Sequence, residues 1–96
     1  MSRNNQNDNT INLIKDKIQR RYYDISRFAM ESAAQCGLTI LDIEVAILNG
    51  EIINIEEDSK GEKYEIVGED GLIIVEGRFS FAGKYMIFSV YTINVW

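Results

Sequence analysis

The sequence predicts an α+β domain in which three N-terminal helices precede a four-stranded antiparallel β-meander, with the helices packed on one sheet face. The first half of the chain repeats apolar residues at spacings of three and four, which is typical of amphipathic helices. From Glu51 onward, β-branched and aromatic residues form short runs that are separated by glycine-containing turns. The chain contains no proline, which agrees with an uninterrupted sheet.

Length and composition predict one globular domain. The chain has 96 residues, of which 46% are hydrophobic and 26% are charged. Residues 1–9 are polar and rich in asparagine, so we expect a disordered tail there and a single domain over residues 10–96. The polar start is not typical of a signal peptide, and no apolar run approaches the roughly 20 residues of a membrane span. One cysteine, Cys36, cannot form an internal disulfide, so we expect a cytoplasmic protein.

Two of the three helices carry chemical markers at their boundaries. The first helix is expected to begin after Thr10, and its apolar face comprises Ile11, Ile14, Ile18, Tyr22 and Ile25. Ser26 is the expected N-cap of the second helix, and Gly37 its stop. We expect Phe28, Ala29, Ala33 and Cys36 to face inward from this second helix.

The third helix is expected over residues 40–48. Thr39 and Asp42 have the spacing of a capping box, with aspartate in place of glutamate. Apolar residues cover most of this helix, which predicts burial against both sheet and helices, and leaves Asp42 and Glu44 facing water.

Four strands are expected over residues 51–56, 63–67, 72–81 and 85–96. Asp70-Gly71 lies between the second and third runs and predicts a hairpin turn. The last run is apolar on both faces, which predicts a central position in the sheet. The side chains expected to be buried in the last two strands are Phe79, Phe81, Ile87 and Ile93.

Charge is distributed unevenly along the chain, whose net charge is −5. Residues 1–30 carry a net +3, whereas residues 31–70 have two cations against eleven carboxylates. An acidic middle repels a phosphate backbone unless it faces away from it. The carboxylates either solvate loops and strand edges or form a partner-facing surface. The residues assigned to partner binding are Arg20, Arg21, Glu56, Glu57 and Asp58.

The sequence excludes several chemistries. There is no histidine, which removes Ser-His and Cys-His nucleophile pairs and most zinc sites. The glycines do not form a phosphate-binding loop, and we expect neither a metal ion nor a cofactor. Cys36 lies at the C-terminal end of its helix, where the helix dipole disfavours a thiolate, so we interpret it as a core residue.

Four polar residues could still act on a phosphate without histidine: Arg27, Arg78, Lys84 and Tyr91. Cations beside a tyrosine could hold a phosphate group and stabilise the charge of its transition state. Alternatively, Arg78 and Lys84 solvate a hairpin and the tyrosine completes the sheet.

The central stretch resembles the small bacterial family known as domain of unknown function 4258, whose fold is thought to be related to RelE- and BrnT-like toxins. The matching residues are Ile25-Ser26, Ala29, Gly37-Leu38-Thr39, Asp42-Ile43, Asn49 to Ile53, Lys60-Gly61, Lys63 to Gly68 and Val90-Tyr91. Where family members usually show a histidine, this chain has Phe28, and where they often show an arginine it has Cys36. The third strand also lacks the family's common histidine, so the resemblance implies a polar site replaced by apolar residues.

We therefore predict a non-catalytic protein-binding module on a toxin-like fold, acting through a protein partner. One alternative is a RelE-type ribonuclease that uses Arg27, Arg78, Lys84 and Tyr91. Another is a phage or mobile-element inhibitor whose acidic face imitates nucleic acid. The acidity makes nucleic acid an unfavoured partner. No membrane association is expected, and self-association stays open.

Overall fold

A computed structural model describes residues 4–93, with side chains from residue 9 onward, and has three helices and a five-stranded mixed sheet. The helices are α1 (Asn4–Gln19), α2 (Arg27–Gln35) and α3 (Ile40–Leu48). The strands are β1 (Tyr23–Ile25), β2 (Glu51–Asp58), β3 (Gly61–Val67), β4 (Ile73–Phe79) and β5 (Tyr85–Thr92). The predicted α+β class is confirmed.

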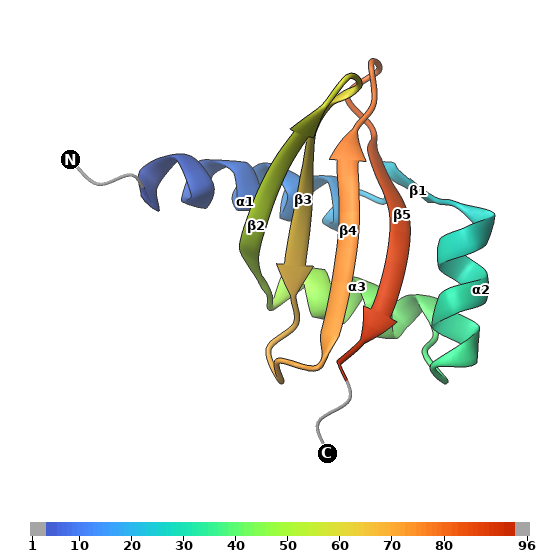
Figure 1. The fold of residues 1–96 in the computed structure, drawn as a ribbon. Helices are drawn as coiled ribbons and strands as arrows, with labels where there is room; N and C mark the ends of the chain where they lie inside the picture. Colours follow the sequence, from blue (N-terminus) through green and yellow to red (C-terminus); the bar gives the residue numbers. More distant parts are fainter. Residues whose placement is uncertain (1–3, 94–96) are drawn as a thin grey trace.

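The sheet has the strand order β1-β5-β4-β3-β2. Strands β2 to β5 form the predicted antiparallel meander, and β5 is an internal strand, as expected. Strand β1 was not predicted, and it pairs with β5 in parallel, with Tyr23 opposite Tyr85. In Figure 1, α1 and α3 lie behind the sheet and α2 stands beside β5, so the front face of the sheet carries no helix.

The first helix differs from its prediction at both ends. It begins at Asn4, so residues 4–9 belong to a helix instead of the predicted tail, and residues 1–3 lie outside the described residues. It ends at Gln19, because Arg21 adopts a positive φ of 59° and the chain then enters β1. Tyr22 and Ile25 are therefore not helical, although the spacing of apolar residues continued through them.

The other two helices begin where their caps predict. Ser26 accepts a hydrogen bond from the Ala29 backbone amide, and the Ser26 amide donates to Ile87 of β5. Thr39 and Asp42 form the complete capping box of α3, each side chain accepting from the other residue's backbone amide. These caps fix the start of α2 against β5 and the start of α3.

The core lies between the sheet and the helices. Its largest fully buried members are Tyr85, Ile14, Ile43, Ile47, Ile66, Val75, Ile87 and Val90. Tyr85 packs directly over Gly77, where an added Cβ would lie 2.6 Å from its ring. The close approach of this ring explains why β4 carries a glycine in its middle.

Several burial predictions were wrong. Cys36 is exposed at the end of α2, and its sulfur accepts a hydrogen bond from the Thr92 hydroxyl. Phe81 is fully exposed, because β4 ends at Phe79 and Phe81 lies in the turn that follows, and Ile93 is exposed just beyond β5. Phe28 is 65% exposed on α2, whose buried residues are only alanines.

Glu44 reverses another expectation, because it is buried on α3 although it was predicted to face water. Its carboxylate accepts hydrogen bonds from the Tyr23 hydroxyl and from Arg21. Burial, followed by the hydrogen bond and charge of Glu44, raises the pKa of Tyr23 to about 12. The charge is tolerated inside the protein because β1 and the turn before it supply both donors.

Candidate partner-binding site

A hollow lies where the tips of two hairpins meet. Its volume is about 1080 Å³, and its lining comprises Ser59, Lys60, Arg78, Phe79, Ser80, Phe81, Met86 and Phe88. Figure 1 shows the β2–β3 tip and the β4–β5 tip side by side at the upper end of the sheet. Residues far apart in the sequence therefore line one surface.

An ion pair joins the two hairpins. Arg78 of β4 donates two hydrogen bonds to Asp58 at the end of β2, at 2.9 and 2.8 Å, across the intervening strand β3. The hydrogen bonds from Arg78, followed by one from the Lys60 backbone amide, hold the pKa of Asp58 well below its usual range. The pair therefore stays charged across the physiological pH range and holds the hairpin tips together.

A β-bulge lies beside this surface, at Phe88 of β5. Glu76 pairs with Ser89 and Gly77 pairs with Ile87, so Phe88 is the extra residue on β5. The Arg78 guanidinium lies 5.5 Å from the centre of the Phe88 ring, a cation–π distance.

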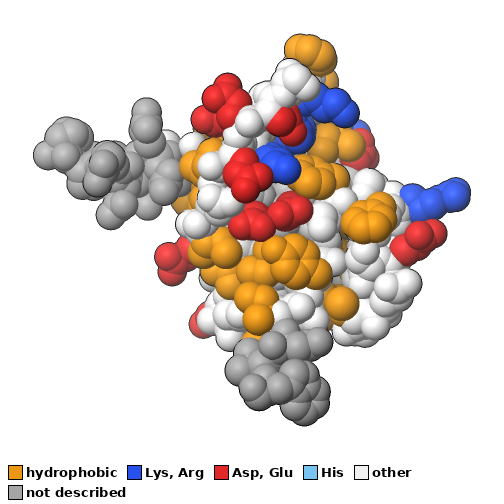
Figure 2. All heavy atoms as spheres, in the orientation of Figure 1, with side chains coloured by type: hydrophobic (Ala, Val, Ile, Leu, Met, Phe, Trp, Pro, Cys, Tyr) orange, Lys and Arg blue, Asp and Glu red, His pale blue; other side chains and the backbone are white. Residues whose placement is uncertain are grey.

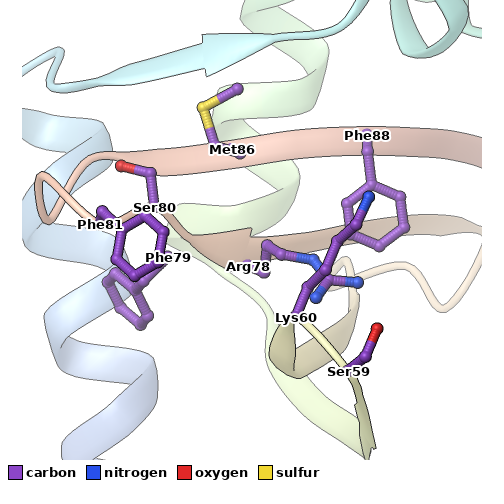
Figure 3. Close-up of a pocket in the computed structure, with 8 residues that line it drawn as sticks. All are labelled: Ser59, Lys60, Arg78, Phe79, Ser80, Phe81, Met86 and Phe88. Atoms are coloured by element: carbon purple, nitrogen blue, oxygen red, sulfur yellow. The ribbon is translucent and has the colours of Figure 1, made fainter.

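Aromatic rings lie at both ends of the hollow. In Figure 3, Lys60 and Arg78 lie between Phe88 at one end and Phe79 with Phe81 at the other. The ring of Phe79 packs edge-on against Tyr64 and Tyr85 and is anchored in the core. Phe81 protrudes beside it and is fully exposed. Aromatic side chains around an arginine, one of them fully exposed, are the composition typical of energetically important interface residues.

The residues assigned to partner binding do not gather on one surface. Asp58 pairs with Arg78, which lines the hollow, and the neighbouring Glu56 pairs with Lys63 of β3 at 3.4 Å. Glu57 is exposed on β2. Arg20 pairs with Asp16 at the end of α1, and Arg21 pairs with the buried Glu44. The three acidic residues thus lie on β2, near the hairpin tips, whereas the two arginines pair with carboxylates of the helices α1 and α3.

The four residues of the ribonuclease alternative are also not assembled. Arg78 is held by Asp58, whereas Lys84 pairs with Asp24 on β1 at 3.2 Å. The Tyr91 hydroxyl donates to Glu65 at 3.1 Å. Tyr91 pairs with Ile74, which is four residues before Arg78 on β4, or roughly 13 Å away at the usual rise per strand residue. Arg27 is exposed at the start of α2. Three of the four side chains therefore face separate carboxylates.

A carboxylate pair on the front face of the sheet was not predicted. Glu65 and Glu76 are directly opposite each other on β3 and β4. Burial and then the hydrogen bond and charge of Glu65 raise the pKa of Glu76, whereas the hydrogen bond from Glu76 lowers that of Glu65. Figure 2 shows acidic and basic side chains gathered over this part of the sheet, with hydrophobic side chains around them. Only the strand register, which sequence does not supply, brings the two glutamates together.

Among residues 4–93, no group of three or more His, Cys, Asp or Glu side chains is arranged to hold a metal ion. Within that range, no helix is both long and apolar enough to cross a membrane.

Comparisons of the chain with protein-family models, with curated proteins and with solved structures found no match. The resemblance to the domain of unknown function 4258 family, which rests on the residues given above, therefore stays a prediction. The candidate site is defined by its own geometry.

Proposed function

We propose that this protein is a non-catalytic binding module that acts through a protein partner and works in the cytoplasm. The observation that carries the proposal is the fully exposed ring of Phe81 beside the hollow between the two hairpin tips. An isolated exposed apolar residue needs no explanation, but here Phe88, Met86 and the half-buried Arg78 line the same hollow.

The energetics of such a surface suit a protein partner. Burial of an aromatic side chain stabilises a complex by about 1.5–3 kcal/mol. The hairpin tips are already fixed to each other by Arg78 and Asp58, so less conformational entropy is lost when they bind. Lys60 offers the hollow a positive charge at its rim.

The ion pairs favour binding over phosphate chemistry. A catalytic arginine must be available to the reacting phosphate, and Arg78 already has both terminal nitrogens hydrogen-bonded to Asp58. Neighbouring carboxylates likewise occupy Lys84 and Tyr91.

The test is affinity capture from the native host with three immobilised baits: wild type, Phe81→Ser and the control Leu13→Ser. Leu13 is an exposed apolar residue of α1 and does not line the hollow between the hairpin tips. We expect mass spectrometry to identify a protein that wild type and Leu13→Ser retain and that Phe81→Ser loses. RNA cleavage by the wild type that disappears in Arg78→Ala would contradict the proposal, as would identical captured proteins for all three baits.

A further inference from the structure

A second apolar surface lies on α3, at the opposite end of the sheet from the hairpin tips. Ile43, Ala46 and Ile47 are buried toward the sheet. On the other side of the helix, Leu41 is 66% exposed and Val45 is 47% exposed. A nine-residue helix thus has two apolar faces, and no described segment of this chain covers the outer one.

This outer face borders a hollow of about 370 Å³ between α3 and the β3–β4 turn. Leu41 and Val45 are one helical turn apart and line one side of it, and Ile73 at the start of β4 lines the other. The turn lies close to the helix at Gly68, where an added Cβ would be 3.3 Å from the Cβ of Ala46. Leu72, which precedes Ile73, is also exposed and extends the apolar surface.

Every charged side chain that lines this hollow is acidic: Asp42, Glu69 and Asp70. Asp42 accepts from the backbone of Thr39, and Asp70 accepts from the backbone of Leu72. Backbone amides therefore fix two of the carboxylates in place. None of the three forms a salt bridge within the described part of the chain.

The sign of the charge selects the occupant. A second copy of this surface would place carboxylates against carboxylates, and a nucleic acid would bring phosphates to them. A cationic segment would be attracted to the rim, and its apolar side chains would fill the hollow between Leu41 and Ile73.

We propose that this hollow docks a cationic amphipathic segment of a partner protein. The apolar face of the segment packs on Leu41, Val45 and Ile73, and its lysines or arginines face Asp42, Glu69 and Asp70. The proposal is independent of the hairpin-tip site, because the two hollows share no residue.

The test uses a fluorescent helical peptide of leucine and lysine, about four turns long, and a matched peptide in which glutamate replaces lysine. Fluorescence anisotropy at about 0.15 M salt measures the affinity of each for the full chain. We expect the lysine peptide alone to bind, and Leu41→Ser to weaken it about tenfold or more, because an apolar contact is lost. Glu69→Lys should weaken it as well.

Two control variants separate this site from general attraction to an acidic protein. Leu13→Ser removes an exposed apolar residue on α1, and Glu31→Lys reverses an exposed charge on α2. Both controls, and Phe81→Ser, should bind the lysine peptide within about twofold of wild type. Circular dichroism checks folding, and Val45→Ser replaces Leu41→Ser should the latter not fold.

The proposal is overturned by equal binding of both peptides, by equal weakening in the controls, or by no binding at all. Self-association of the wild type that Leu41→Ser abolishes would assign the surface to a second copy and would also overturn it. Because Phe81→Ser is expected to leave peptide binding intact, failure here and failure of the hairpin-tip proposal are distinguishable.

Discussion

Arg78 reaches across β3 to form two hydrogen bonds with Asp58, so that a single side chain joins the first and second hairpins of the sheet. The exposed fraction of Arg78 is only 17%, whereas that of Asp58 is 42%. The pair is therefore half-sheltered, and the tips that it joins line the candidate binding hollow.

This ion pair predicts a specific acid response. The folded-state pKa of Asp58 is below its unfolded value, so its contribution to stability is present above about pH 4 and is lost as pH falls through the folded pKa. We expect Asp58→Asn to lower the melting temperature at pH 7 and the difference from wild type to shrink in strong acid. Glu57→Gln, at the neighbouring exposed position, is the control, and equal melting of Asp58→Asn and wild type at every pH would contradict the prediction.

The raised pKa of Glu76 predicts the opposite pH dependence. The pKa of Glu76 is raised in the folded state, so above its unfolded value of about 4.5 the folded protein holds more protons, and stability falls as pH rises through that window. Glu76→Gln should therefore increase the free energy of unfolding at pH 7 by about 0.2–1 kcal/mol and have no such effect at pH 3. Urea titrations at the two pH values measure this difference, and a destabilised variant at pH 7 would refute it.

Two tyrosines should respond in opposite directions to removal of the hydroxyl. Tyr23 donates to the buried Glu44, so Tyr23→Phe should lower the free energy of unfolding by about 1–3 kcal/mol. The hydroxyl of Tyr85 is buried and has no hydrogen-bond partner among the described residues. Tyr85→Phe should therefore leave stability unchanged or raise it, as measured by chemical denaturation. Equal losses in both variants would contradict the assigned hydrogen bonds.

The internal strand β5 gives a direct test of packing. Ile87 is fully buried on β5, so Ile87→Ala should lower the free energy of unfolding by about 2–5 kcal/mol. Ile93 is exposed beyond the same strand, and Ile93→Ala should cost less than about 0.5 kcal/mol. Thermal and urea melts measure both values, and similar costs would show that the strand is not packed as described.

Local chemistry explains why most of the fold could be predicted. Ser26 and the Thr39–Asp42 pair cap helices through contacts between residues that are three apart in the sequence. Such contacts can be predicted from the residue types and their spacing. Strand β1 was missed because three residues are too few to show a period of two. Its pairing of Tyr23 with Tyr85 depends on a contact across most of the chain.

The site was less predictable for the same physical reason. Asp58 was singled out by its charge and Arg78 by its chemistry, but their pairing depends on a register that places β3 between them. The bulge at Phe88 adds one residue to β5, which no alternation pattern reveals. Phe81 was expected in the core because the end of β4 was predicted two residues too late, at Phe81 instead of Phe79.

The measurement that tests the central claim most directly is calorimetric titration of the purified captured partner into wild type, Phe81→Ser and Leu13→Ser. The account predicts that Phe81→Ser weakens the dissociation constant by about tenfold or more, because one aromatic contact is lost. Leu13→Ser should bind like wild type, and all three should melt at similar temperatures because both side chains are exposed. Equal affinity of Phe81→Ser and wild type would contradict the assignment of the hairpin-tip hollow as the partner-binding site.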